Sequence, residues 1–307
     1  MGHNPISRAR LTIWVAPAVL LLLLAGVGAV KSNAMHHARP ADADIETSVP
    51  GLRPATADAG KEEAASQIPG PSAVRLPAHS MALVIGNGRY SDRGASPWHP
   101  VEDARAMADE LRGRGFDVTF KENLSKQGMR DGFSSFAAKV DPGATALIFF
   151  SGYGIQSARR TYLIPVNSEI WSEEDVQRDG LPLDPVLIDL DARGVTTKLV
   201  VIDASRRNPF ERRFRGGSIG LAPISTPKGT LAIYSATPNQ VAPDSDTGMF
   251  VGELIAQMRR DGASLEDAFN RTRTMVARAS HNEQVPGVFS SLTEDLPPPP
   301  APGTPAR

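Results

Sequence analysis

The chain has 307 residues, with 33 lysine and arginine residues against 34 aspartate and glutamate residues, and it contains no cysteine. The lack of cysteine excludes a disulfide framework, a cysteine-ligated zinc or iron–sulfur site and a thiol nucleophile. The net charge of −1 gives no electrostatic reason for nucleic-acid binding, which depends on an excess of lysine and arginine.

The segment 11–30 is uncharged and apolar, and it follows a short basic N-terminus, 1–10. A helix of this length spans the hydrocarbon core of a bilayer. The preceding arginines favour an N-terminus inside the cell and a domain on the extracytoplasmic, periplasmic side. The alternative is a signal peptide cleaved at the small-x-small sequence Ser32–Ala34, which would release a secreted protein. We favour a single-pass anchor, because the apolar run is longer than an ordinary signal peptide requires.

Two further segments have compositions that do not favour a packed core. Residues 31–77 are rich in alanine, proline, aspartate, serine and glutamate, and they are predicted to form a disordered linker. Residues 296–307 form a proline-rich tail. One folded domain is therefore expected at 78–295.

Within this domain, short apolar runs that end on glycine or polar residues alternate with segments of helical periodicity. Strands are expected at 81–86, 117–123, 144–151, 162–166, 198–205 and 229–236. Helices are expected at 101–113, 126–140, 183–192, 249–260 and 265–279, with Ser125 as the N-cap of the second. This alternation predicts an α/β fold in which helices flank both faces of a mainly parallel sheet.

In parallel sheets, ligands bind beyond the carboxyl ends of the strands. Those ends are predicted at 87–88, 151–154, 203–205 and 235–237. No zinc-binding HExxH sequence and no phosphate-binding GxxxxGK[ST] loop occurs in the chain, so we expect no metal and no cofactor.

Two strand ends carry a combined pattern: FFSGYG at 149–154 and VIDASRRNPF at 201–210. With ALVIGNGRY at 82–90 and the segment 284–286, they resemble the caspase/metacaspase family of cysteine peptidases in its bacterial form. The family carries a His-Gly pair at the first strand end and Asp-Ala-Cys-Arg-Asn-Asn-Pro-Phe at the second. The resemblance covers about 81–295 and implies a caspase-like three-layer sandwich.

The resemblance places Tyr153 at the family's histidine and Ser205 at its cysteine, and the spacing of 52 residues is that of the family. A thiol with a pKa of about 8.5 supplies some thiolate unaided, whereas a serine hydroxyl needs an adjacent base. Tyrosine, with a pKa of about 10, is a poor general base at neutral pH. We therefore predict an inactive pseudopeptidase that binds a peptide or protein ligand as a regulatory module.

Two alternatives remain open. The first is a hydrolase that cleaves peptides after Arg or Lys, uses Ser205 as its nucleophile, and is assisted by Tyr153 or by His99. The second is a structural partner of an active caspase-like paralogue.

Four further residues are candidates for the same site. Gly154 follows the histidine position, where a backbone N–H can stabilise an oxyanion. The resemblance implies that Asp203 holds a basic P1 side chain, although a structural ion pair of Asp203 with a nearby arginine is the alternative. Ser235, at the next strand end, and Asp246, in the loop that follows, are candidate substrate-binding residues.

Overall fold

The computed structural model describes residues 79–90, 99–205, 208, 210, 214, 220–243 and 249–293. All of them fall in the second of two compact units, Gln67–Arg307. The predicted anchor at 11–30, the linker at 31–77, the tail at 296–307 and Asp246 lie outside the described residues. Over the described ranges, no helix is both long and apolar enough to cross a membrane.

The centre of the fold is a six-stranded sheet with the strand order β2-β1-β3-β7-β8-β9. Its strands are β1 (Ser80–Gly86), β2 (Asp117–Glu122), β3 (Thr145–Ser151), β7 (Thr197–Asp203), β8 (Thr230–Tyr234) and β9 (Gly287–Ser290). The first five in chain order run parallel, and β9 pairs antiparallel with β8. The strands β1, β3, β7 and β8 are buried along nearly their whole length, which explains their continuous apolar sequences.

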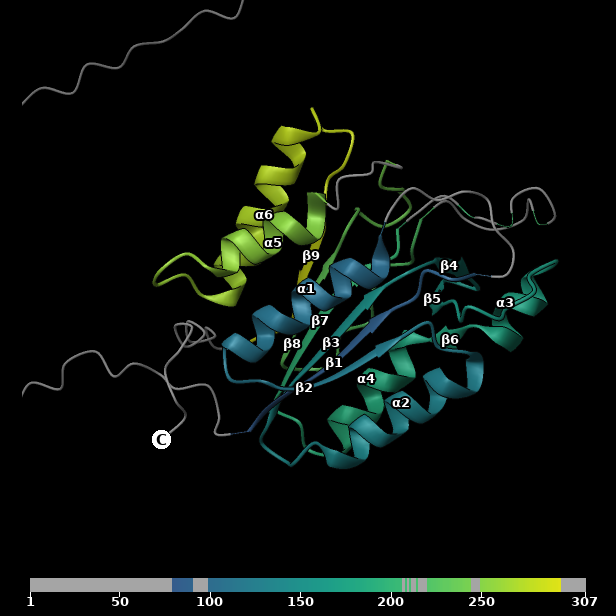
Figure 1. The fold of residues 1–307 in the computed structure, drawn as a ribbon, viewed down its shortest axis with the longest axis horizontal. Coiled ribbons are helices and arrows are strands. Elements are labelled where there is room, and N and C mark those ends of the chain that lie inside the picture. The colour runs from purple at the N-terminus through teal and green to yellow at the C-terminus, as the bar shows by residue number, and fades with distance from the viewer. Residues whose placement is uncertain are drawn as a thin grey trace, which may run out of the picture. The chain divides into compact units, whose positions relative to one another are not determined.

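Helices cover both faces of this sheet (Figure 1). One face carries α1 (Pro100–Gly113), α5 (Met249–Met258) and α6 (Leu265–Ala279), and the other carries α2 (Lys126–Lys139) and α4 (Leu183–Ala192). A hydrophobic core lies on each face of the sheet, and alternate residues of β1 point into one or the other. Val84 packs in the core beneath α1, α5 and α6, and Leu83 and Ile85 pack in the core beneath α2 and α4. The prediction of a mixed α/β fold with a mainly parallel sheet between helices is confirmed.

The start of α2 follows from its sequence. The Ser125 hydroxyl accepts a hydrogen bond from the Gly128 N–H at 3.2 Å, as predicted for an N-cap. The side chains of Met129, Phe133 and Phe136 are buried against the sheet. Each such side chain contributes about 1.5–3 kcal/mol relative to an exposed position.

A second, antiparallel sheet was not predicted from the sequence. It consists of β4 (Gly154–Ser157), β5 (Arg160–Leu163) and β6 (Leu181–Pro182), and the helix α3 (Glu173–Asp179) lies between β5 and β6 in the chain. The strand expected at 162–166 instead ends at Leu163. The helix α3 begins with a capping box between Ser172 and Asp175, which stabilises a helix of only seven residues.

Candidate functional site

Two of the predicted strand ends lie side by side. In the paired strands β3 and β7, Ser151 is opposite Asp203. The pairing continues beyond the strands, because the Gly152 N–H donates to the Asp203 carbonyl and the Gly154 N–H to the Ala204 carbonyl, both at 3.2 Å. The parallel register therefore brings the segments that contain Tyr153 and Ser205 to the same edge of the sheet.

The Tyr153 side chain is only 7% exposed. Its ring lies 4.7 Å from the ring of Tyr90, between centroids, at an interplanar angle of 55°. Both rings belong to an apolar cluster that also contains Tyr162, Phe210 and Phe214. Phe210 and Phe214 follow Ser205 in the chain, so Tyr153 is part of a small aromatic core beside the second strand end.

Tyr90 fixes the backbone of this turn, a role that the sequence analysis missed. Its hydroxyl accepts a hydrogen bond from the Tyr153 N–H at 2.8 Å and donates one to the Ile164 carbonyl at 3.1 Å. Burial raises the pKa of Tyr90 far above its ordinary value, so the hydroxyl keeps its proton. The only sequence signal was its place four residues after β1, in GNGRY.

Replacing Tyr90 by Phe is expected to destabilise the fold, because it leaves the buried Tyr153 N–H and Ile164 carbonyl without this partner. The free energy of unfolding in urea should fall by about 1–3 kcal/mol. The matched control is Tyr162→Phe, which removes a hydroxyl that bonds to none of the described residues and should cost less than about 0.5 kcal/mol. Equal losses in the two variants would show that the Tyr90 hydroxyl does not hold the turn.

Ser205 is buried, with 1% exposure, and its Oγ atom has no hydrogen-bond partner among the described residues. Its carbonyl accepts a hydrogen bond from the Ala242 N–H at 2.6 Å. No side chain in the described part of the chain is therefore placed to take the proton from Oγ. As far as the described residues show, Ser205 has the surroundings of a packed side chain.

Gly154 is required for close packing of the two strand ends. A Cβ atom at this position would lie 2.7 Å from Leu221 Cδ2 and 3.0 Å from Ala204 Cβ. The Gly154 N–H already donates to the Ala204 carbonyl at 3.2 Å. An oxyanion bound here would have to compete with that carbonyl for the same proton.

The remaining candidates occupy different places. Asp203 is fully buried at the last position of β7. Ser235 is also fully buried, its Oγ has no partner among the described residues, and its carbonyl accepts a hydrogen bond from Gln284 Nε2 at 2.8 Å. Since β7 and β8 are neighbours, Asp203 and Ser235 lie at adjacent strand ends.

His99 is not brought to Ser205 in the described structure. It is exposed, directly precedes α1, and lines a pocket of about 270 Å³ together with Arg105, Glu122 and other residues near the carboxyl ends of β1 and β2. None of the lining residues comes from 151–154 or 203–205. Over the same described ranges, no group of three or more histidine or acidic residues is placed to hold a metal ion.

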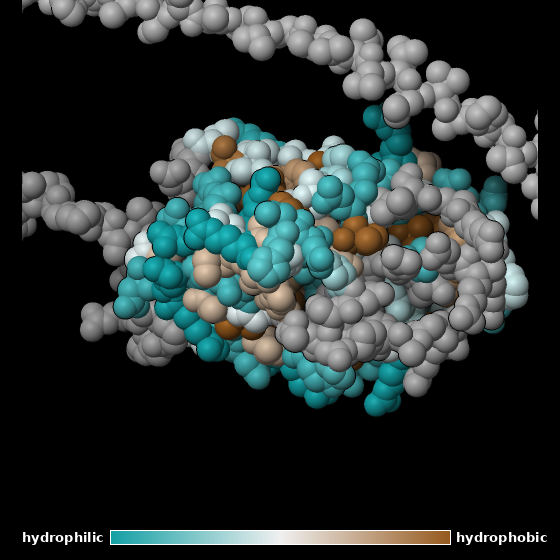
Figure 2. Space-filling model, turned by 90° about the horizontal axis from the view of Figure 1, so that it is seen from above, coloured by the Kyte–Doolittle hydropathy of each residue, from teal (hydrophilic) through white to brown (hydrophobic). Residues whose placement is uncertain are grey.

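Figure 2 shows one face of the molecule, on which hydrophilic side chains predominate. Its hydrophobic patches are small and separated wherever described residues form the surface. The described surface of this face therefore offers no broad apolar docking area, and ligand binding there would depend on polar contacts.

The comparisons with known proteins concern the fold and the family of the chain. The fold is similar to the crystal structure of protein GSU0716 from Geobacter sulfurreducens, with a TM-score of 0.51 and 16% identity over 71% of this chain and 95% of that chain. At this identity the likeness shows a shared fold. A comparison with curated proteins gives no match. The model of the caspase domain family matches residues 79–297, which is well over half of the chain, and the chain therefore belongs to the caspase domain family.

Proposed function

We propose that this caspase domain binds a peptide or protein ligand without cleaving it and acts as a regulatory module. In this proposal Tyr153 and Ser205 occupy the positions of the family's catalytic histidine and cysteine. The observation that carries the proposal is the state of Ser205: its Oγ is buried and unpartnered among the described residues. A serine hydroxyl becomes a nucleophile only when an adjacent base removes its proton.

Two other features of the strand ends support the same conclusion. The Tyr153 ring packs against Tyr90 in the aromatic cluster, where the parent mechanism would need an imidazole that exchanges protons. The Gly154 N–H already donates a hydrogen bond to the Ala204 carbonyl. The nucleophile, the base and one oxyanion donor are thus all unfavourable for hydrolysis, which also weighs against Ser205 as the nucleophile of a serine hydrolase.

The ligand class that we propose is a peptide or protein segment with a basic side chain. Asp203 has a carboxylate at the end of β7, and Ser235 has a hydroxyl at the neighbouring end of β8. Both residues are fully buried, so in this proposal a ligand reaches them only through a local opening of the structure at these strand ends. A carboxylate forms its strongest hydrogen bonds with guanidinium and ammonium groups. Arginine or lysine in the ligand is therefore the chemistry that this pair of strand ends favours.

The catalytic part of the proposal is tested by incubating the full chain with peptides that contain Arg or Lys at P1 and following them by mass spectrometry. We expect no cleavage. Cleavage that disappears in the Ser205→Ala variant would overturn the proposal and establish the serine hydrolase instead.

The binding part is tested by fluorescence anisotropy with a labelled peptide that contains arginine and with the same peptide carrying glutamine. We expect the arginine peptide to bind about tenfold more tightly, which corresponds to about one charge-assisted hydrogen bond. The Asp203→Asn variant should lose this preference, whereas Asp109→Asn, at a highly exposed site, should keep it. Equal binding of the two peptides by the unmodified chain would contradict the proposed ligand class.

We propose also that residues 11–30 anchor the domain to a membrane, with the domain on the extracytoplasmic side. This rests on the length and apolarity of the segment in the sequence. Extraction of membranes with alkaline carbonate should leave the chain in the pellet. Release into the supernatant would indicate a cleaved signal peptide.

A further inference from the structure

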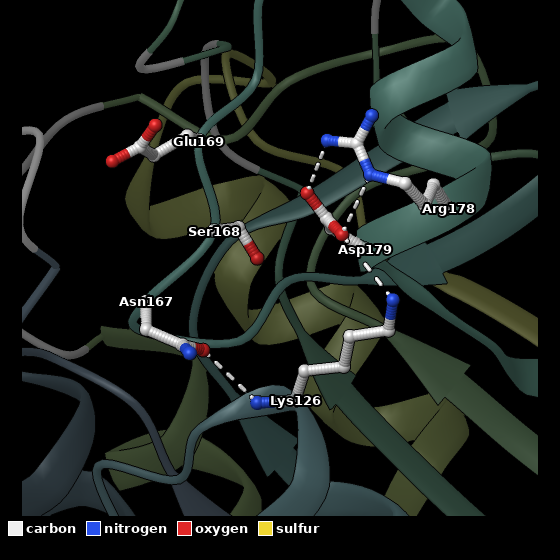
Figure 3. A pocket seen from close by; sticks show the side chains of 6 residues that line it. All are labelled: Lys126, Asn167, Ser168, Glu169, Arg178 and Asp179. Carbon is white, nitrogen blue, oxygen red and sulfur yellow. Dashed lines mark hydrogen bonds and ion pairs between the residues drawn. The ribbon is translucent and has the colours of Figure 1, made fainter.

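A small polar pocket lies away from the paired strand ends. It has a volume of about 240 Å³ and is lined by Lys126, Asn167, Ser168, Glu169, Arg178 and Asp179 (Figure 3). We call it the Lys126 pocket. Lys126 is the first residue of α2, and Arg178 and Asp179 are the last two residues of α3. No lining residue belongs to the segments that contain Tyr153 and Ser205.

Asp179 connects the two cations of the pocket. Its Oδ1 lies 3.2 Å from Lys126 Nζ and 3.1 Å from Arg178 Nε, and its Oδ2 lies 2.7 Å from Arg178 Nη2. The hydrogen bonds from Arg178 and Lys126 lower the pKa of Asp179, so its carboxylate stays charged and already accepts three hydrogen bonds. Asp179 therefore orients both cations while leaving them further N–H groups to donate.

The donors that remain can be counted from the contacts. An ammonium group has three N–H bonds, and Lys126 uses one of them, for Asp179. A guanidinium group has five, and Arg178 uses three, for Asp179 and Asp175. Each cation thus keeps two N–H donors, and Lys126 also stands at the positive end of the α2 dipole.

Ser168 gives an independent sign of a ligand. Its side chain is 3% exposed, and its Oγ has no hydrogen-bond partner among the described residues. In Figure 3 this hydroxyl points into the pocket, toward the side that holds Lys126 and Asp179, whereas the Glu169 carboxylate points away from both. A buried hydroxyl without a partner is unfavourable by about 1–3 kcal/mol, and an acceptor bound in the pocket would remove that cost.

We propose that the Lys126 pocket binds a small molecule through a carboxylate group, which accepts hydrogen bonds from Lys126 Nζ and Ser168 Oγ. The charges of the lining residues balance, with Lys126 and Arg178 against Asp179 and Glu169, so a monoanion fits better than the dianionic form of phosphate. The volume lies below the range of about 300–1,000 Å³ that is typical of pockets for drug-sized ligands. The site therefore suits a ligand with few heavy atoms.

The test uses the full chain with acetate as the probe, monitored by saturation-transfer difference NMR at constant ionic strength. We expect a saturable acetate signal that inorganic phosphate displaces only at higher concentration. The variants Lys126→Gln and Ser168→Ala should each bind acetate about tenfold more weakly, the effect of one charge-assisted hydrogen bond.

Matched controls separate binding from folding. Lys121→Gln and Ser134→Ala change the same residue types at exposed positions outside the pocket and should leave acetate binding unchanged. Ser168→Ala should not lower the melting temperature of the unmodified chain, because it removes a buried hydroxyl without a partner among the described residues, and Lys126→Gln tests the site independently. The Ser205→Ala variant should bind acetate normally, so this proposal can fail without affecting the proposed function.

Three outcomes would overturn the proposal. The first is the absence of saturable acetate binding to the unmodified chain. The second is unchanged affinity in both pocket variants. The third is phosphate that binds more tightly than acetate, which would show that the pocket selects a different anion.

Discussion

The Ser205→Cys variant is expected to react with iodoacetamide at least about a hundredfold more slowly than the Ser134→Cys variant, because a buried thiol reacts only after a local opening of the structure. Because the natural chain has no cysteine, each variant carries a single thiol, and its alkylation is measured by mass spectrometry. Alkylation requires an accessible thiolate. Ser205 is 1% exposed, whereas Ser134 is exposed on α2, so the thiol at position 205 must wait for a local opening of the structure.

The control for this comparison is the same reaction in urea, where both thiols are exposed and should react at similar rates. Similar rates under native conditions would mean that position 205 is open to solvent. Ser205 would then be accessible to a substrate, even though its hydroxyl lacks a partner among the described residues. The experiment thus tests the burial of this position directly, without a substrate.

The central sheet could be predicted because its strands are buried on both faces. The runs that form β1, β3, β7 and β8 are continuously apolar, and the segments between them have helical periodicity. The small sheet could not be predicted in the same way. β4 has four residues, of which only Ile155 is a large apolar one, and β6 has only two residues, so neither strand has a recognisable apolar pattern. The pairing of β9 with β8 depends on long-range contacts of a four-residue strand.

Some features of the candidate site could likewise be predicted from the sequence, and others could not. The meeting of the strand ends at Tyr153 and Ser205 follows from parallel topology, which places successive carboxyl ends at one edge of the sheet. The burial of Ser205 and the two hydrogen bonds of the Tyr90 hydroxyl do not follow from topology. They depend on how Tyr90 and the aromatic residues after Ser205 pack together. Sequence spacing thus predicts where the candidate site lies, and side-chain packing determines the burial and the hydrogen bonds of its residues.

The other large effect is expected at Glu110 on α1. Its Oε1 accepts a hydrogen bond from Arg114 Nε at 2.6 Å, and its Oε2 accepts one from Arg259 Nε at 2.7 Å. The side chains of Glu110 and Arg114 are each only 4% exposed, and Arg114 also donates to the Met258 carbonyl at the end of α5. The carboxylate therefore neutralises a buried guanidinium and ties α1 to the segment that ends α5.

The Glu110→Gln variant should lose about 3–5 kcal/mol of unfolding free energy, because Arg114 is left buried with an unbalanced charge. Urea denaturation measures the loss. Asp109→Asn is the matched control: Asp109 pairs with Arg112 at 2.9 Å, but its side chain is 75% exposed, so the change should cost at most about 1 kcal/mol. Similar losses in the two variants would show that water solvates the charge of Arg114 when Glu110 is neutral. The ion pair would then contribute little to holding α1 against α5.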